Sequence, residues 1–109
     1  MYPVGYVRWV PVEFTREYLS WFGSLRDSRT RTRILTRVER LSAGHPGSHR
    51  HLGEGVFELK VDFGPGYRVY YSMLGPNRLT MLAGGDKSTQ TRDIGKAMEL
   101  GRQYRRGKE

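Results

Sequence analysis

This chain has no cysteine among its 109 residues. Neither a disulfide framework nor a thiolate metal site is therefore available, and nothing in its cysteine usage indicates secretion. No apolar run approaches the roughly 18 residues that a membrane-spanning helix needs. Residues 1–5 also lack the basic start and long apolar core of a signal peptide. We therefore expect a cytoplasmic protein with no membrane partner.

Negative charge is scarce as well. Eleven acidic residues stand against nineteen basic ones, for a formal net charge of +8, and fifteen of the basic residues are arginine. The planar guanidinium group suits bidentate phosphate contacts and stacking on bases. Such an excess favours nucleic acid or an acidic protein as partner. The length predicts a single domain over residues 1–109, with flexible ends at residues 1–6 and 105–109.

Metal-binding patterns are missing too. Three histidines, His45, His49 and His51, fall in a Gly-, Ser- and Pro-rich segment that we predict to be a loop over residues 42–54. No HExxH motif or Cys/His spacing accompanies them, so we expect neither a metal nor another cofactor. A histidine that shuttles protons stays open as an alternative.

The stretch around which the rest is organised is residues 55–71. Polar and apolar residues alternate on both sides of Gly64-Pro65-Gly66, which predicts two strands joined by a tight turn. Because successive side chains of a strand point to opposite faces, Glu58, Lys60 and Arg68 should leave one open face together. That face suits phosphate binding. From the hairpin alone, an ordinary solvated face with a cross-strand ion pair is the simpler explanation.

Two helices should precede this hairpin. Thr15 is a good N-cap for the first, and Asp27 or Ser28 for a second that runs to about Ala43. The short join between them predicts an antiparallel helical hairpin. Arginines on the second helix are candidates to follow an RNA backbone, although a solvated helix face is the simpler reading: Arg33, Arg37 and Arg40.

The remaining segments complete an α+β pattern. Residues 6–14 indicate an edge strand broken at Pro11, and residues 78–83 a buried strand. The following Gly84-Gly85-Asp86-Lys87 is not a P-loop, because Asp86 stands where that motif needs glycine. A terminal helix and a turn at residues 75–77 are also expected. This order predicts an antiparallel core sheet with the helices on one of its faces.

Several of these segments resemble one known family, the RelE/HigB-like toxins of type II toxin–antitoxin systems, in the branch called addiction module killer proteins. The similarity spans about residues 8–104. The residues that carry it lie in five segments: Phe14, Trp21-Phe22, Leu25 and Asp27; Arg33-Ile34, Arg37 and Arg40-Leu41; Gly53, Gly55-Val56 and Glu58-Leu59-Lys60; Gly64-Pro65-Gly66-Tyr67-Arg68-Val69-Tyr70; and Gly84-Gly85-Asp86-Lys87-Ser88 with Gln90, Asp93 and Ile94.

The resemblance implies a RelE-like fold and a toxin that cleaves mRNA, usually on the ribosome. Relatives need no metal, because the RNA 2′-hydroxyl attacks the adjacent phosphate and basic side chains stabilise the developing charge. It also implies a cognate antitoxin, expected to be a small helix-turn-helix DNA-binding protein.

The resemblance further assigns site residues. Arg68 matches the family's phosphate-binding arginine, Lys60 a basic residue on the preceding strand, and Lys87 a further catalytic or substrate-contacting position. Glu58 stands where the prototype has a second lysine, so it either acts as general base or holds the neighbouring cations. Tyr70 is the candidate for the prototype's RNA-binding aromatic, with Tyr104 as the other option.

Three other functions remain open at this stage. The ParE toxins share the fold but inhibit DNA gyrase. A metal-dependent nuclease can be read from Glu58 and Lys60, with Glu54 or Glu39 as a second acidic ligand. A non-catalytic module that binds nucleic acid or protein would explain the charge without any chemistry.

Overall fold

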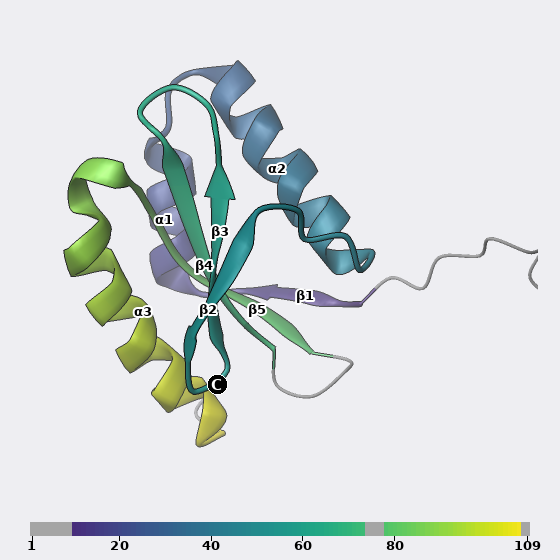
Figure 1. The fold of residues 1–109 in the computed structure, drawn as a ribbon, viewed down its shortest axis with the longest axis vertical. Coiled ribbons are helices and arrows are strands. Elements are labelled where there is room, and N and C mark those ends of the chain that lie inside the picture. The colour runs from purple at the N-terminus through teal and green to yellow at the C-terminus, as the bar shows by residue number, and fades with distance from the viewer. Residues whose placement is uncertain (1–9, 74–77, 108–109) are drawn as a thin grey trace, which may run out of the picture.

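The computed structural model describes residues 10–73 and 78–107. Its strands are β1 (Val12–Phe14), β2 (His49–Gly53), β3 (Val56–Val61), β4 (Tyr67–Met73) and β5 (Leu79–Asp86). Its helices are α1 (Arg16–Ser24), α2 (Ser28–Ser42), a short 3₁₀ turn η1 (Lys87–Thr89) and α3 (Gln90–Arg105). The strands form one five-stranded sheet in the order β1-β5-β4-β3-β2 (Figure 1). The expected α+β class is confirmed. None of the helices within the described ranges combines the length and apolar composition needed to cross a bilayer.

The sheet has an antiparallel core with one parallel edge. Strands β2, β3, β4 and β5 pair antiparallel in succession, whereas β1 runs parallel to β5. The sheet is therefore mixed. Its parallel pair joins β1, the first strand in sequence, to β5, the last. Of the strand expected over residues 6–14, residues 6–9 lie outside the described residues. The predicted turn at residues 75–77 and the ends at 1–6 and 108–109 lie outside them as well.

The prediction of a loop over residues 42–54 is wrong for its second half. Residues His49–Gly53 form β2, which pairs only with β3 and is an edge of the sheet. Most of its side chains are exposed, so the segment needs no apolar alternation. A polar edge strand lacks the period-two pattern that marks a half-buried strand.

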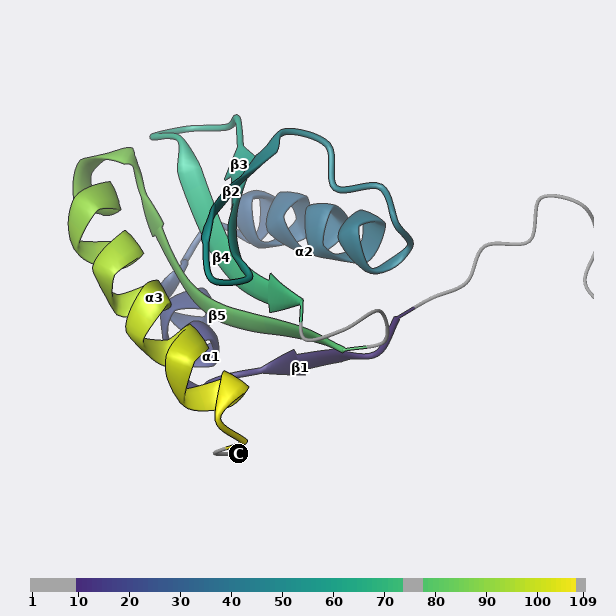
Figure 2. The same cartoon turned by 60° about the horizontal axis from the view of Figure 1, so that its bottom comes forward.

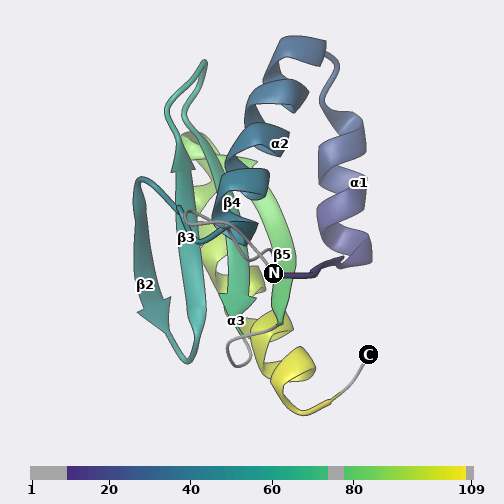
Figure 3. The ribbon, with the colours of Figure 1, turned by 90° about the vertical axis from the view of Figure 1, so that its right-hand side faces the viewer.

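Helices α1 and α2 begin at the predicted caps. The Thr15 hydroxyl oxygen accepts a hydrogen bond from the amide of Tyr18 at 2.9 Å and donates to the Leu82 carbonyl at 2.7 Å. The Asp27 carboxylate accepts from the Arg29 amide at 3.1 Å. Both helices cover one face of the sheet and run in opposite directions (Figure 3). They contribute Tyr18, Ile34, Val38 and Leu41 to the larger core.

The expectation that all helices share one face is wrong for α3. This helix covers the opposite face and forms a second core with β3, β4 and β5 (Figure 2). The reason is that β4 and β5 are buried on both faces, so each face needs a cover. The predicted helical hairpin is also not a simple N-terminal unit, because β1 precedes it and α1 packs on β5 while α2 packs on β3.

The end of α3 is held by an ion-pair cluster. Glu54, in the β2–β3 turn, contacts Arg102 at 3.2 Å and Arg105 at 2.7 Å. The hydrogen bond from Arg105 to the backbone carbonyl of Glu54, at 2.7 Å, adds a further contact. Arg105, the first residue of the expected flexible end, is therefore the last residue of a helix and is tied to the sheet.

Gly84 and Gly85 allow two side chains to pack directly on the backbone of β5. A Cβ atom at Gly84 would lie 2.2 Å from the Trp21 ring, and one at Gly85 would lie 1.8 Å from Oδ2 of Asp93. The two residues face opposite sides of the sheet, one toward α1 and the other toward α3. This close approach gives the Gly84-Gly85 pair a packing role.

Candidate functional site

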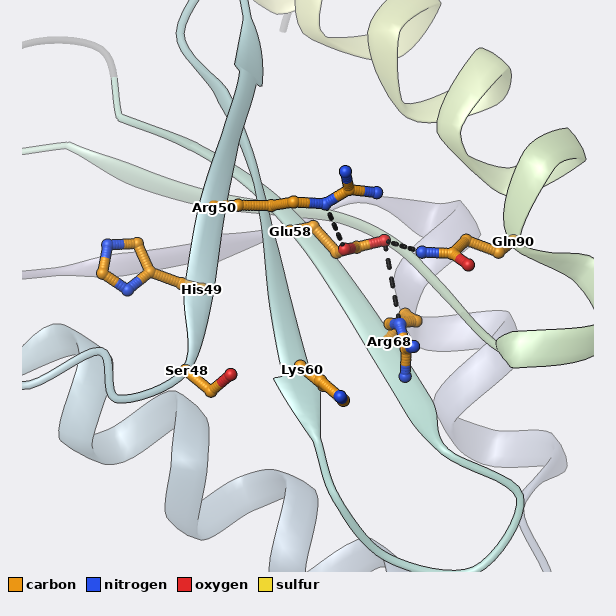
Figure 4. A pocket seen from close by; sticks show the side chains of 7 residues that line it. All are labelled: Ser48, His49, Arg50, Glu58, Lys60, Arg68 and Gln90. Carbon is orange, nitrogen blue, oxygen red and sulfur yellow. Dashed lines mark hydrogen bonds and ion pairs between the residues drawn. The ribbon is translucent and has the colours of Figure 1, made fainter.

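A polar pocket of about 270 Å³ opens on the α3 side of the sheet, near the start of that helix. It is lined by Ser48, His49, Arg50, Glu58, Lys60, Arg68 and Gln90 (Figure 4). These residues come from β2, β3, β4, the segment before β2 and the first residue of α3. The pocket thus brings together parts of the chain that are up to 42 positions apart in sequence.

Strand register brings the charged side chains together. Arg50 lies opposite Glu58 across β2 and β3, and Lys60 lies opposite Arg68 across β3 and β4. Residues that are directly paired across strands point to the same face. The prediction that Glu58, Lys60 and Arg68 share a face is therefore confirmed. Arg50 joins them from the neighbouring strand.

Glu58 is the centre of this cluster. The Nε atom of Arg50 donates to one carboxylate oxygen at 2.8 Å, and the side-chain amide of Gln90 donates to the other at 2.8 Å. The Nε atom of Arg68 lies 3.9 Å from the second oxygen (Figure 4). Glu58 is only 4% exposed, so it is a buried carboxylate with three polar neighbours.

These neighbours keep Glu58 ionised. Burial by itself raises the pKa of the Glu58 carboxyl, but the hydrogen bonds from Arg50 and Gln90 and the charges of Arg50 and Arg68 outweigh it, so that the pKa lies below its usual range. A carboxylate with both oxygens engaged and a lowered pKa is a weak proton acceptor. Of its two predicted roles, the contacts favour holding Arg50 and Arg68 over acting as general base.

The alternation predicted that Arg68 lies on an open face, and this prediction is wrong. Arg68 is 7% exposed, because the α3 side of the sheet is covered at this point. One terminal nitrogen donates to the Gly66 carbonyl at 3.1 Å. Its Nε atom has no hydrogen-bond acceptor among the described residues. A buried donor without an acceptor costs free energy, and the Glu58 carboxylate, 3.9 Å away, is the charge that compensates it.

Lys60 is an exposed cation of the pocket, as is Arg50. The backbone of Lys60 is fixed on both sides: its amide donates to the Ser48 carbonyl at 3.0 Å, and its carbonyl accepts from Arg37 at 2.6 Å. The position of the lysine side chain is therefore set by β3, while its ammonium group remains accessible to a ligand.

Lys87 lies at the rim and does not line the pocket. It is exposed, in the turn η1 that follows β5. A Cβ atom at Gly66 would lie 3.3 Å from a terminal nitrogen of Arg68 and 3.6 Å from Cβ of Lys87. Both cations therefore flank the turn between β3 and β4.

The assignment of Tyr70 to RNA binding is contradicted. Its side chain is fully buried in the second core, against α3. Burial, as the largest cause, raises the pKa of the Tyr70 hydroxyl. A ring without exposed surface cannot stack on a base, so Tyr70 supports the site from below and does not contact a ligand.

The three candidate RNA-binding arginines of α2, Arg33, Arg37 and Arg40, do not line this pocket. They line a separate groove between α2 and the end of β3. The guanidinium of Arg37 is occupied by backbone carbonyls. It donates to the carbonyl oxygens of Pro46 at 2.8 Å and Ser48 at 3.2 Å, in addition to that of Lys60. Arg33 and Arg40 are exposed.

The sequence interpretation missed Arg50 and Gln90. Arg50 lies in the segment predicted to be a loop. Gln90 belongs to the last segment of the family resemblance, but no role was assigned to it. The available signal was the charge of Glu58, a carboxylate that would be buried on the sheet and would need donors from neighbouring elements. The His49 ring, in contrast, points away from the carboxylate (Figure 4), and its Nδ1 lies 2.7 Å from the Gly47 carbonyl oxygen.

Glu54 and Glu39, the suggested second acidic ligands, lie away from Glu58. Glu54 forms ion pairs with Arg102 and Arg105, and Glu39 lies on α2. Within the described residues, no group of three or more His, Cys, Asp or Glu side chains is close enough to hold a metal ion.

Glu58→Gln should flatten the acid dependence of stability. Because the folded state lowers the pKa of Glu58 below its unfolded value of about 4.3, its ionised form stabilises the fold above about pH 4.3, and this contribution is lost as pH falls through the folded pKa. We expect the melting temperature of the wild type to fall more steeply than that of the variant between about pH 5 and pH 3. Glu99→Gln, on the exposed side of α3, should keep the wild-type slope. Equal slopes for all three proteins would show that Glu58 is not held as described.

Comparisons with known proteins identify a relative but no described activity. No family model matches the chain, and no solved structure matches it. A Haemophilus influenzae protein, named only as an uncharacterized protein, is 37% identical over 91 residues, which cover 84% of this chain and 92% of the relative. The chain therefore belongs to the same family as this Haemophilus influenzae protein.

Proposed function

We propose that this protein is the toxin of a type II toxin–antitoxin system and an mRNA endoribonuclease that acts without a metal and inhibits translation, in association with the ribosome. The observation that carries the proposal is the pocket in which Arg50, Lys60 and Arg68 surround one buried carboxylate. The three cations carry more positive charge than Glu58 carries negative charge, so the pocket is suited to an anion such as a phosphodiester.

The proposed reaction uses groups of the RNA itself. The 2′-hydroxyl oxygen forms a bond to the adjacent phosphorus, and the bond from phosphorus to the 5′ oxygen of the next nucleotide breaks. The products are a 2′,3′-cyclic phosphate and a 5′-hydroxyl end: the 2′ proton passes to solvent water, and the 5′ oxygen takes up a proton from water. Arg68 and Arg50 bind the non-bridging oxygens, and Lys60 neutralises the charge that develops at the pocket mouth.

Within this proposal, Glu58 orients the cations and does not take the proton. Its hydrogen bonds to Arg50 and Gln90 fix the strand edge and the start of α3 relative to each other. Such pre-organisation lowers the barrier because the charged groups need not reorganise during the reaction. Lys87, at the rim, supplies a further positive charge near Arg68.

The proposed partner is a small helix-turn-helix antitoxin that covers the basic surface with acidic or extended segments. The net charge of +8 steers anionic partners, and this attraction weakens with salt. Co-expression of this antitoxin should relieve growth arrest and yield a complex that co-purifies.

The proposal is tested by the chemistry of RNA ends after induction. Amino-acid incorporation should stop before DNA synthesis, and cut mRNAs should carry 2′,3′-cyclic phosphate and 5′-hydroxyl ends. Any cleavage of ribosome-free RNA by the purified protein should persist in EDTA. Double-strand DNA breaks with continuing translation would instead assign the protein to the ParE class. Harmless expression without cut RNA would indicate a binding module.

A further inference from the structure

The groove between α2 and the end of β3 has the features of a nucleotide site. Its volume is about 300 Å³, at the lower end of ligand pockets. Arg33, Arg37 and Arg40 line it from the helix, and Asp62 and Phe63 line it from the strand end. It lies on the α2 side of the sheet, whereas the pocket around Glu58 lies on the α3 side.

Arg33 and Phe63 form a stacking platform in this groove. The guanidinium carbon of Arg33 lies 4.3 Å from the centre of the Phe63 ring, within the range of a cation–π contact. Two backbone hydrogen bonds make the turn that carries Phe63 rigid: its amide donates to the Val61 carbonyl at 2.9 Å, and its carbonyl accepts from Gly66 at 3.1 Å. Arginine planes and aromatic rings are the surfaces on which proteins stack unpaired bases.

The groove carries a net positive charge, with three arginines against one carboxylate. Asp62 is its single carboxylate, and among the described residues no ion pair involves Arg33, Arg37 or Arg40. Burial and the charge of Arg40 lower the pKa of Arg37. Like charges that repel one another in this way are relieved when an anion binds between them.

Arg37 connects the groove to the pocket. Its guanidinium donates to the carbonyls of Lys60 and Ser48, at 2.6 and 3.2 Å, and both of these residues line the pocket. Lys60 and Phe63 are three residues apart, which in extended chain is at most about 10 Å. The β2 side of β3 is occupied as far as Lys60, by the pairing with β2 up to Leu59 and by the hydrogen bonds of Lys60 with Ser48 and Arg37. Beyond Lys60, no described strand pairs with that side of the chain, so a single strand of RNA can pass around residues 61–63.

We propose that this groove binds a nucleotide of single-stranded RNA that neighbours the one whose phosphate occupies the pocket, with its base stacked on the Arg33–Phe63 pair and its phosphate near Arg40. This inference rests on the proposed function for the choice of RNA. Stacking tolerates any base, so the subsite sets the register of the strand and not its sequence.

The test is an abasic scan of binding. The probe is a short single-stranded oligoribonucleotide with 2′-O-methyl groups throughout, which cannot be cleaved by attack of its own 2′-hydroxyl. One nucleotide at a time is made abasic, and the dissociation constant is measured by fluorescence anisotropy. In the wild type, loss of one particular base should weaken binding by about 5-fold or more. In Phe63→Leu, all oligonucleotides should bind more weakly, and the same abasic position should make no further difference.

Matched variants separate stacking from charge and from folding. Phe63→Tyr retains a ring and should keep both the affinity and the abasic pattern. Arg33→Gln should weaken binding and reduce the dependence of log affinity on log salt by about 0.7, whereas Phe63→Leu should leave that slope unchanged. Phe14→Leu removes an exposed ring on the other side of α2, and Arg29→Gln removes a charge outside the groove. Both should bind like the wild type.

The outcomes distinguish this inference from the proposed function. An identical abasic scan for wild type and Phe63→Leu would overturn the subsite, even if the enzyme produces cyclic phosphate ends. No measurable binding at low salt would overturn it as well. The predicted abasic pattern in a protein that cuts no RNA would support the subsite and refute the ribonuclease.

Discussion

Arg68→Ala is expected to slow RNA cleavage by about 10²–10³-fold, as for the removal of one donor that stabilises transition-state charge. The guanidinium lines the pocket, with its Nε atom 3.9 Å from Glu58, and the proposed reaction places negative charge there. Arg68→Lys should rescue only in part, because a point charge cannot hold two phosphate oxygens in a bidentate manner. The measurement is the single-turnover cleavage rate, together with growth arrest on induction.

The stability of the same variant needs its own control, because Arg68 is buried. Its loss should cost about 1–3 kcal/mol, less than the rupture of an isolated buried pair, since Glu58 keeps its bonds to Arg50 and Gln90. Arg106→Ala, an equal change in charge at an exposed position after α3, should keep both the rate and the melting temperature. If Arg68→Ala is unfolded, Arg68→Gln retains length and a donor for Gly66. A folded variant that cleaves at the wild-type rate would refute the assignment.

Gly85→Ala is expected to destabilise the fold by about 1–3 kcal/mol or more, the usual cost of overpacking. The new Cβ atom would lie 1.8 Å from Oδ2 and 2.8 Å from Cγ of Asp93, and 2.9 Å from Oγ1 of Thr89. Asp93 is 7% exposed and accepts a hydrogen bond from the Thr89 hydroxyl, so it cannot move away without loss. Displacement of the start of α3 would also break the hydrogen bond from Gln90 to Glu58.

Gly95→Ala is the matched control, because it makes the same chemical change in the same region. No atom lies within 4 Å of a Cβ atom at this position on α3. Alanine in a helix interior should stabilise the protein by about 0.5–1 kcal/mol relative to glycine. Thermal melts of the two variants should therefore shift in opposite directions. Equal melting temperatures would mean that β5 and α3 do not approach as closely as described.

Local signals predicted much of the fold. Thr15 and Asp27 are N-caps because their side chains reach amides two or three residues away. The alternation around Gly64-Pro65-Gly66 predicted that Lys60 and Arg68 share a face, and the two residues are paired across β3 and β4. These features depend on neighbours in sequence, so they can be read without knowledge of the rest of the chain.

The sequence by itself thus determined the caps, the central hairpin and the common face of Glu58, Lys60 and Arg68. Only the tertiary structure decided that α3 covers this face, which buries Tyr70 and Arg68 and brings Gln90 to the carboxylate. It likewise decided that β2 is an edge strand that presents Arg50. The physical reason is that edge strands and the choice of a sheet face depend on contacts between segments distant in sequence, which leave no local periodicity.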